Sequence, residues 1–599
     1  MSAPLYDVAI IGGSTGGTAA YLAACALGVN AILVSETTRL GGQFTVQGVS
    51  ALDEHAYIET FGGTASYMRL RQTIRAIYQR EYGAPARMPH SLLGDDKPLN
   101  PGNGWVSRLC FLPSVGVAAL DAMLTNAPYT LPILCGWRPV AVQQIGDHIQ
   151  AVVVQDASGS QQPIRARYYL DATDAGDLIA LAGVPYVTGA ESRTETGETA
   201  AAETAKPSEV QGFTYSFAVE FRVGEDHTIP KPEGYEAFRD RQPYTLAPLG
   251  RDGKPVTYRM FAQHGENLPF WTYRRIHDGA LLGGNDIALI NWVSNDYHGG
   301  DILNADEATR QRYLDEAKRL SLGFLYWLQT ECPRDVGGKG YPELKLRADI
   351  MGTADGLSEL PYLRESRRIL PLTRITAQAI AAETNDGARA CHFAASVGIG
   401  WYAMDLHPCV GNPQASLYAP TRPFQLPLGA LIPQQPINLI AACKNIGTTH
   451  LTNGAYRLHP TEWAIGEAAL HVAAFCAHNN LTPHALHADA WQVLRLQHRL
   501  VQHGIPIAWA VDVLPAHPHF HSTQMLLANG VLAPEGGRWH SLIVEPAQPL
   551  GESVCLEQLR QLAARLSVGG AHIAPASLHA DLTWAELCSI FNQAWHVLA

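Results

Sequence analysis

Several features are missing from this 599-residue sequence, and their absence excludes whole classes of protein. The ten cysteines are scattered and no two form a CxxC pair, which excludes a thioredoxin-type redox pair and gives no zinc-ligand spacing. No run of eighteen apolar residues occurs, so we expect no membrane-spanning helix. The first ten residues carry neither the basic region nor the cleavage site of a signal peptide. We therefore expect a cytoplasmic protein that does not contact a membrane.

Charged residues are also scarce, and the basic ones are in the minority. Lys and Arg number 43 against 55 Asp and Glu, which gives a formal net charge of −12. Binding to nucleic acid depends on clustered basic side chains that neutralise phosphates, so we expect no nucleic-acid partner. Hydrophobic residues make up 47% of the chain and charged residues 16%, which favours large buried cores and excludes a mostly disordered protein.

The N-terminus has the pattern of a βαβ unit. Tyr6 to Ile11 form a short β-branched run typical of a buried parallel strand. The glycine-rich turn from Gly12 to Gly17 follows, and then an Ala-rich helix from Thr18 to Leu27, with Gly28 as its C-cap. A second strand, AILVS, ends at Glu36. Strand, turn, helix, strand and acidic residue in this order predict a dinucleotide-binding site.

Each part of this unit has a physical role in binding a dinucleotide. The turn needs a glycine at position 12, and the helix N-terminus directs free N–H groups and a positive dipole end at a pyrophosphate. The carboxylate of Glu36 is placed to bind ribose hydroxyls. The sequence departs from the usual GxGxxG pattern at one position, because Ser14 stands where the second glycine is expected.

Later segments indicate which dinucleotide it is. Arg39, Gly41, Gly42 and Gln43 directly follow Glu36, and they resemble the second diphosphate contact of glutathione-reductase-like flavoproteins. A strand over 168–172 leads into Thr173-Asp174-Ala175-Gly176-Asp177, which resembles a further FAD-binding segment of that group. Another strand is expected over 437–442, and His459-Pro460 begins a helix whose positive end would face the flavin.

The whole set resembles the FAD_oxidored family of FAD-dependent oxidoreductases, sometimes labelled xanthan-lyase-associated, over roughly residues 5 to 480. The matching segments include GGQFT (41–45), DEH (53–55), NDYHGGD (295–301), RESRRI (364–369), DLHP (405–408) and the long run from Lys444 to Ala469. The resemblance implies FAD as the cofactor and no metal. The residues expected to hold FAD are Gly12, Gly13, Ser14, Gly16, Gly17, Glu36, Arg39, Gly41, Gly42, Gln43, Ala172, Thr173, Asn445, Pro460 and Thr461.

The expected fold class is α/β, with a discontinuous Rossmann-like FAD-binding domain, an inserted α+β substrate domain and a helical C-terminal appendage. We expect the FAD-binding domain over residues 1–185 and 386–482, the substrate domain over 186–385 and the appendage over 483–599. The appendage weakly resembles S-layer-homology-like helical modules, and packing or dimerisation is its expected role. The polar stretch from Gly189 to Pro207 reads as an exposed linker.

Dehydrogenation by a flavin requires a substrate C–H bond beside the flavin and a base for the accompanying proton. His407 is the first candidate for that base or for a substrate anchor. Arg457, His459 and His450 flank the start of the flavin-facing helix, where a cation would stabilise negative charge. Arg367 is a further candidate for binding a substrate anion. The DEH and NDY segments are weaker candidates for the edge of the site.

We therefore expect an FAD-dependent enzyme that dehydrogenates a small polar substrate and passes electrons to oxygen or another acceptor. No second nucleotide-binding fingerprint is visible, so NADH and NADPH should reduce the flavin only slowly. The alternatives are a flavin-dependent reductase of the fumarate-reductase type and a non-catalytic flavin-binding partner protein. A homo-oligomer is possible.

Overall fold

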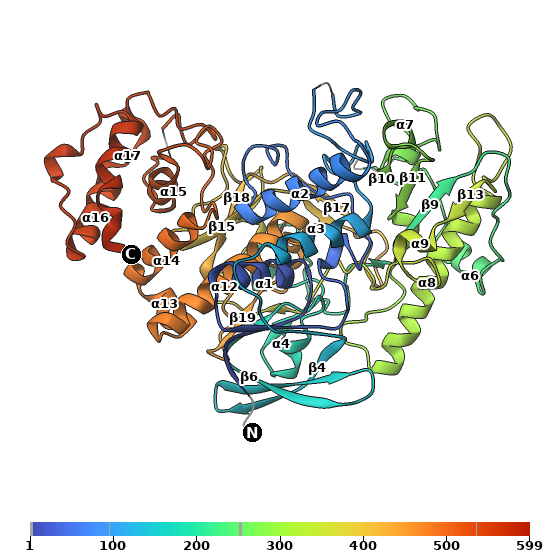
Figure 1. The fold of residues 1–599 in the computed structure, drawn as a ribbon, viewed down its shortest axis with the longest axis horizontal. Helices are drawn as coiled ribbons and strands as arrows, with labels where there is room; N and C mark the ends of the chain where they lie inside the picture. Colours follow the sequence, from blue (N-terminus) through green and yellow to red (C-terminus); the bar gives the residue numbers. More distant parts are fainter. Residues whose placement is uncertain (1–3, 95, 251–253, 535, 599) are drawn as a thin grey trace.

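A mixed sheet lies at the centre of the computed structural model, which describes residues 4–94, 96–250, 254–534 and 536–598 (Figure 1). Five parallel strands run in the order β3 (Ile133–Cys135), β2 (Ala31–Ser35), β1 (Leu5–Ile11), β6 (Gln161–Asp171) and β19 (Leu439–Ala441). An antiparallel extension from β6 adds β5 (His148–Asp156) and β4 (Trp137–Ile145). This arrangement agrees with the α/β class and the Rossmann-like unit expected from the sequence.

The parallel strands are apolar because helices cover them. Every residue of β2 and the last four residues of β1 are buried. The helices α1 (Thr15–Leu27) and α12 (His459–Asn479) pack directly against each other beside β1. The expected N-terminal helix is confirmed, although it begins at Thr15 and not at Thr18, and Gly28 caps it with a left-handed backbone.

A second, antiparallel sheet lies to one side of the first (Figure 1). Its strand order is β10 (Arg275–His277), β11 (Ile287–Ile290), β9 (Phe217–Phe221) and β13 (Leu344–Leu346). The long helix α8 (Glu307–Thr330), which the sequence predicts over about 305–330, packs in the same region. Its buried apolar face shares a separate hydrophobic cluster with β9 and β11.

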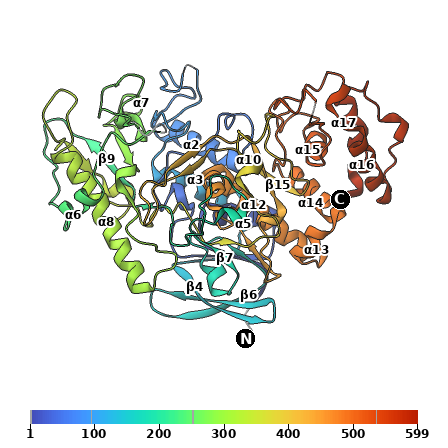
Figure 2. The same ribbon diagram turned by 180° about the vertical axis from the view of Figure 1, so that it is seen from behind.

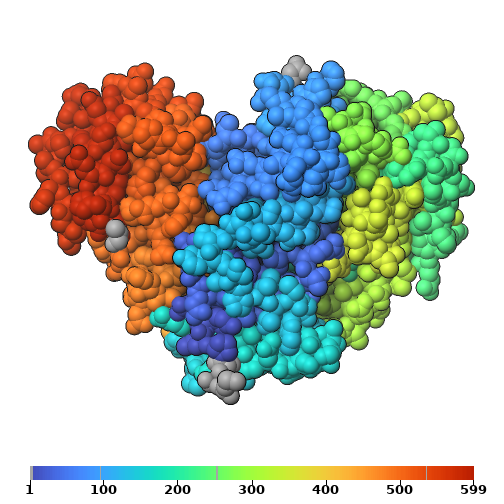
Figure 3. All heavy atoms as spheres, viewed as in Figure 1, coloured from blue at the N-terminus to red at the C-terminus, as the bar shows by residue number. Residues whose placement is uncertain are grey.

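The C-terminal helices lie at the opposite side of the molecule (Figure 2). They are α13 (Pro483–Ala488), α14 (Ala490–Gln502), α15 (Phe520–Ala528), α16 (Leu556–Val568) and α17 (Trp584–Asn592). In the space-filling view they form one lobe, and the outline is hollowed between this lobe and the N-terminal residues in lighter blue (Figure 3). Their buried side chains nevertheless belong to the same hydrophobic cluster as the central sheet, so this region is continuous with the main core.

The remaining elements connect these layers. The helices are α2 (Ala65–Glu81), α3 (Pro113–Thr125), α4 (Asp177–Leu181), α5 (Arg193–Thr196), α6 (Tyr235–Arg241), α7 (Gly279–Leu282), α9 (Ala348–Met351), α10 (Ala377–Ile380) and α11 (His450–Tyr456). The short strands are β7 (Tyr186–Val187), β8 (Phe213–Thr214), β12 (Asp296–Tyr297), β14 (Arg368–Ile369), β15 (Ser396–Gly400), β16 (Met404–Leu406), β17 (Leu417–Ala419) and β18 (Phe424–Pro427). No helix in these described ranges has the length and apolar character needed to cross a bilayer.

The expectation of an exposed linker over 189–207 holds only in part, because residues 193–195 and 203–207 are exposed but others are buried. This stretch contains α5, which starts with a capping box formed by Ser192 and Glu195. Glu191 pairs with Arg368 at 3.1 Å, and Glu198 accepts a hydrogen bond from the Thr449 hydroxyl at 2.7 Å. Both carboxylates are buried. Two of the polar residues in this stretch, Glu191 and Glu198, therefore bind the interior of the protein.

Candidate functional site

The turn after β1 brings backbone into close contact with the neighbouring strand. Gly12 has a φ of 115°, and a Cβ atom at this position would lie 2.1 Å from the carbonyl oxygen of Ala172. Ser14 is the N-cap of α1, and its hydroxyl accepts a hydrogen bond from the N–H of Gly17 at 3.1 Å. Ser14 thus replaces the expected glycine without disturbing the helix start. Within the described residues, the N–H groups of Ser14 and Thr15 have no hydrogen-bond acceptor.

The loop from Leu40 to Gln43 is tied to this turn by hydrogen bonds. The Thr15 hydroxyl donates to the carbonyl of Gly41 at 3.0 Å and accepts from the N–H of Gln43 at 3.1 Å. Gly42 has a φ of 54°, and a Cβ atom there would lie 2.4 Å from the Thr15 nitrogen. Arg39 lies apart from this contact, because its guanidinium pairs with Glu359 at 2.6 Å.

Glu36 follows β2 and reaches solvent. Desolvation of the carboxyl group by the surrounding protein raises its pKa to about 7, although the residue reaches solvent, and the negative charges of Asp177 and Asp174 add to this rise. The charges of Arg310 and Arg138 oppose this shift. Glu36 is therefore an acceptor whose protonation changes near neutral pH.

The end of β6 is held by a buried carboxylate. Asp171 accepts hydrogen bonds from the backbone and hydroxyl of Thr173, at 2.9 and 2.6 Å, and from the N–H of Ile179 at 2.8 Å. The amide of Asn445 donates to the Asp171 carbonyl at 3.0 Å and so connects β6 to the loop after β19. Ala172, Thr173 and Asn445 thus form one side of the same site as Gly12.

Helix α12 completes this site from the C-terminal half of the sequence. Glu462, in the first turn of α12, accepts a hydrogen bond from the N–H of Gly16 at 3.2 Å. Gly466 crosses α1 so closely that a Cβ atom would lie 1.9 Å from the Gly16 carbonyl oxygen. Pro460 occupies the first turn of α12, and Thr461 is buried beside it. The amide of Gln43 hydrogen bonds to Glu462 as well.

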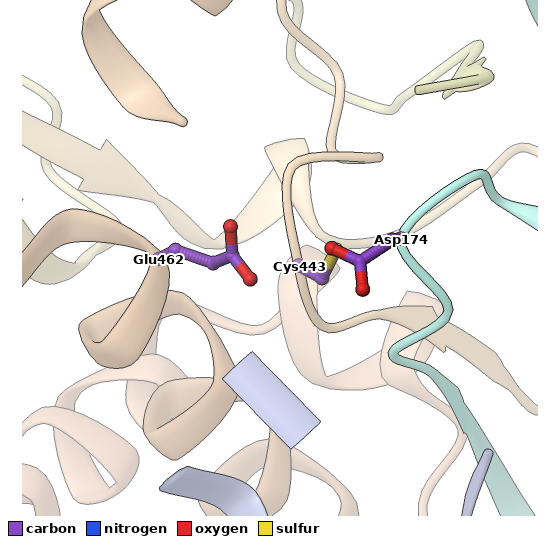
Figure 4. Close-up of side chains that lie close together, drawn as sticks. All are labelled: Asp174, Cys443 and Glu462. Carbon is purple, nitrogen blue, oxygen red and sulfur yellow. The ribbon is translucent and has the colours of Figure 1, made fainter. Parts of the chain in front are cut away.

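Asp174, Cys443 and Glu462 bring possible metal ligands together, with ligand atoms within 4.8 Å of one another (Figure 4). The ammonium group of Lys444 contacts all three residues. It forms an ion pair with Asp174, lies 3.6 Å from the Glu462 carboxylate and lies 3.9 Å from the Cys443 sulfur. One protein cation therefore already lies among these possible ligands.

A second group of charged side chains surrounds His407, beyond the start of α12. We call it the His407 cluster; its members are His407, Asp53, Arg274, Asp296, Arg364, Asp405 and Arg457. It is connected to the first site, because the Gln43 amide donates to the carbonyl of Arg457 at 2.8 Å. The strands β8, β12 and β16 bring its members together from distant parts of the sequence.

His407 is oriented by a buried aspartate. Its Nδ1 lies 2.6 Å from the carboxylate of Asp296. Burial alone would raise the pKa of Asp296, but the charges of Arg364 and His407 and the hydroxyl of Thr214 lower it well below its usual range. An ionised carboxylate can only accept, so Nδ1 carries a hydrogen and donates it to Asp296. The Asp296 carboxylate thus fixes the orientation of the imidazole ring.

Arg364 holds Asp296, the hydrogen-bond partner of His407, in place. Its guanidinium lies 2.8 Å from the Asp296 carboxylate and donates to the Thr214 hydroxyl at 2.9 Å and the Gly212 carbonyl at 2.8 Å. Arg364 and Asp296 are almost fully buried. The Asp296 charge is thus compensated inside the protein and holds its position.

Asp405 and Arg457 lie on the other side of the imidazole. Nε2 of His407 is 3.6 Å from the Asp405 carboxylate, and Arg457 is 3.7 Å from the same group. Burial would raise the pKa of Asp405, but His407, Arg457 and Arg364 lower it to about 2. The Arg457 guanidinium also donates to the hydroxyl of Tyr362 at 2.8 Å.

His459 is held as a neutral side chain by backbone groups. Its Nδ1 accepts from the N–H of Asp53 at 3.1 Å, and its Nε2 donates to the carbonyl of Val49 at 3.1 Å. Burial lowers its pKa to about 4. Both ring nitrogens are used, so in this structure His459 positions the loop around Asp53.

The two other candidates from the sequence lie outside the His407 cluster. His450 lies 3.2 Å from the buried carboxylate of Glu365. Burial would raise the pKa of Glu365, but His450 and Arg368 lower it to about 2. Arg367 pairs with Asp177 at 2.9 Å, next to the end of β6.

Sequence reasoning missed Arg274 and the aromatic residues near it. The guanidinium of Arg274 lies 3.2 Å from the Asp53 carboxylate and donates to the Ala51 carbonyl at 3.0 Å. Tyr362 lies between two cations, with its ring centre 5.0 Å from Arg364 and 6.0 Å from Arg457. No local motif marks Arg274, because Asp53 lies 221 positions earlier in the sequence.

An aromatic wall, formed by His55, Tyr57, Trp401 and Trp509, lies next to the cluster. The rings of His55 and Trp509 have centres 5.2 Å apart, and those of Tyr57 and Trp401 are 5.9 Å apart. Trp509 comes from the segment after α14 and is anchored by a hydrogen bond to the Phe424 carbonyl at 3.1 Å. The C-terminal region therefore contributes directly to the surroundings of His55.

Comparison with known proteins identifies a family. The family model described as "FAD dependent oxidoreductase" matches residues 7–500. No curated protein matches the sequence.

Matches to solved structures are partial. THI4 from Thermovibrio ammonificans is 18% identical, with 31% of this chain and 67% of that one covered and a TM-score of 0.19. The bacillithiol disulfide reductase Bdr from Bacillus cereus is 16% identical, with 29% and 41% covered and a TM-score of 0.18. A 3-ketosteroid dehydrogenase from Rhodococcus jostii RHA1 is 13% identical, with 30% and 50% covered and a TM-score of 0.18. This chain thus spans about half of the length of the last two.

The residues around Gly12 fit the cofactor of this family. Unpaired N–H groups at the start of α1 suit a pyrophosphate, and the accessible carboxylate of Glu36 suits a ribose. The glycine at position 12 is required by the 2.1 Å approach to Ala172. The protein is an FAD-binding flavoprotein.

Proposed function

Because the chain belongs to the family of FAD-dependent oxidoreductases, we propose that it dehydrogenates a small polar organic substrate, with His407 as the base that takes the substrate proton. The observation that carries this proposal is the hydrogen bond of 2.6 Å between His407 Nδ1 and Asp296. In the neutral form of His407 this bond would leave Nε2 as the acceptor, and 26% of the side chain is open to solvent. FAD, when bound, supplies the acceptor for the substrate hydride.

The residues of this chain prepare the substrate for that reaction. Asp296 stabilises the imidazolium that forms when Nε2 takes up a proton, because its charge lies next to Nδ1. Arg364 and Thr214 prevent Asp296 from rotating away. These groups would act only after the substrate enters, and electrons then leave to oxygen or another acceptor.

We further propose that FAD is held by the residues expected from the sequence around Gly12, Glu36, Gly42, Thr173 and Asn445. The N–H groups at the start of α1 would bind the pyrophosphate, and the first turn of α12 would direct its positive end at the flavin. Arg39 would act indirectly, by fixing the loop through Glu359. We also propose that the domains end at residues 185, 385 and 482, as the sequence predicts.

An anaerobic screen tests the proposed activity. Candidate amines, alcohols and sugars are added to the purified holoenzyme, and bleaching of the flavin absorbance is followed. A substrate that bleaches the flavin at a saturable rate supports dehydrogenation. If dithionite-reduced enzyme is instead reoxidised by unsaturated acids while no donor bleaches it, the protein is a reductase and the proposal is wrong.

The affinity for FAD is expected to decrease as the pH falls through about 7. Glu36 has its pKa raised to about 7, so acidification adds a proton to the carboxylate that would accept from the ribose. Replacing Glu36 with alanine should cost roughly 10- to 100-fold in affinity, the value of a hydrogen bond to a charged group. Equilibrium titration of apoprotein with FAD at several pH values measures both effects. The variant Glu36→Gln should bind FAD weakly at every pH. If its affinity for FAD changes with pH as steeply as that of the wild type, Glu36 is not the group that titrates.

A further inference from the structure

The charges of the His407 cluster are arranged so that the cations are hidden. The side chains of Arg274, Arg364 and Arg457 are only 8%, 2% and 2% exposed. Those of Asp405 and His407 are each 26% exposed. With His407 neutral, the three arginines and three aspartates sum to zero charge. An approaching molecule nevertheless meets the carboxylate of Asp405 first.

Asp405 differs from the other two aspartates in the longer distances to its ion-pair partners. Asp296 is paired with Arg364 at 2.8 Å, and Asp53 with Arg274 at 3.2 Å. The nearest side-chain nitrogens to the Asp405 carboxylate, on His407 and Arg457, lie 3.6 and 3.7 Å away, which is longer than a hydrogen bond. The pKa of Asp405 is nevertheless lowered to about 2 by these neighbours, so the group is ionised at neutral pH.

Two tyrosines, Tyr273 and Tyr402, border this carboxylate. Both side chains are partly exposed. Burial and the charges of Asp53 and Asp405 raise the pKa of each phenol, and the ring of Tyr273 already carries the guanidinium of Arg274, 5.2 Å from its centre. The electron-rich face of a tyrosine attracts cations. The surroundings of Asp405 therefore favour a positively charged group.

We propose that the His407 cluster binds the ammonium group of an amine substrate, with Asp405 as its counter-ion and Nε2 of His407 as the acceptor of one ammonium proton. This inference rests on the proposed function and names its substrate class. The distance of 3.6 Å between Nε2 and the Asp405 carboxylate lets one nitrogen atom contact both groups. Transfer of one proton to Nε2 leaves the neutral amine, whose lone pair is needed before its neighbouring C–H bond can lose a hydride.

An anionic substrate fits this arrangement less well. Its carboxylate would meet Asp405 before any arginine, and like charges at such distances repel. Arg457, the candidate anion site in the sequence, already donates to Tyr362 and to the carbonyl of Asp405.

Binding of a matched pair of probes tests the inference without relying on turnover. Isopropylammonium and isopropanol have the same shape, and each is titrated into the anaerobic holoenzyme while the perturbation of the FAD absorbance spectrum is recorded. We expect the ammonium ion to bind at least tenfold more tightly. Asp405→Asn should remove that preference and leave the affinity for isopropanol within twofold.

Two controls make the result interpretable. Asp581→Asn changes an exposed aspartate, 98% accessible, and should leave both affinities unchanged. Asp405→Glu keeps the charge and should keep part of the preference for the ammonium ion. Equal binding of the two probes, an unchanged preference in Asp405→Asn, or no saturable binding of the ammonium ion would each overturn the inference.

The flavin signal separates this inference from the proposed function. If an alcohol or sugar bleaches the flavin and amines do not bind, dehydrogenation stands and the amine assignment fails. If ammonium ions bind through Asp405 but no donor of any class bleaches the flavin, the cation site stands and the proposed function fails.

Discussion

Replacing His407 with alanine is expected to slow reduction of the flavin by its substrate by on the order of 10²-fold or more, while the protein keeps its fold and its yellow colour. A positioned base accelerates proton transfer by roughly 10²- to 10⁴-fold. The side chain is partly exposed and holds no backbone group through its ring nitrogens, so its loss should not disturb the core. Anaerobic stopped-flow measures the rate of reduction separately from saturation by substrate.

The variant Asp296→Asn tests whether the aspartate acts through His407. Loss of its charge removes the support for a protonated imidazole, so the pH at which the rate rises should move downward while saturation by substrate changes little. Asp296→Glu should restore part of the rate. If His407→Ala reduces the flavin at the wild-type rate across the pH range, His407 is structural and the base has to be sought elsewhere.

Replacing Gly466 with alanine is expected to abolish stable FAD binding. The added methyl carbon would lie 1.9 Å from the carbonyl oxygen of Gly16, so α1 and α12 would have to separate. Overpacking of this kind costs about 1–3 kcal/mol, and separation of the helices also moves the N–H groups at the start of α1. The FAD released per chain and the thermal unfolding midpoint with and without added FAD measure the effect.

A matched alanine variant provides the control. Gly537 lies in open space, where an added Cβ would have no atom within 4 Å, so Gly537→Ala should leave FAD content and unfolding unchanged. Should Gly466→Ala retain a full complement of FAD, the helix crossing does not determine the cofactor site. In that case Gly16→Ala, whose added Cβ would lie 2.1 Å from the Ala442 carbonyl oxygen, should also retain its FAD.

The parts of the fold that could be predicted are those coded by neighbouring residues. The run from β1 through α1 to β2 follows from local periodicity, glycines and a cap, and the structure differs only in starting α1 at Thr15. The expected strand over 437–442 is also present, as β19 (Leu439–Ala441). In both cases the signal lies within about twenty residues of the element, where propensity and patterning act.

The candidate site is only partly predictable, because its contacts join distant segments. His407 stands out through its own motif, but its partner Asp296 is 111 positions away and no spacing rule connects the two. His459 matches the family motif equally well, yet backbone groups use both of its nitrogens. Composition is misleading at 189–207, because buried carboxylates that pair with Arg368 and Thr449 look like surface residues in a sequence.

The contact between Gly16 and Glu462 also has a consequence for biosynthesis. The two residues are 446 positions apart, so the ribosome emits the first long before the second. At roughly 10 residues per second the nascent chain waits about 45 s before α12 can complete the cofactor site. During that interval the apolar strands β1 and β2 lack one of their covering helices. The cofactor site can therefore be complete only after α12 has been synthesised, late in translation.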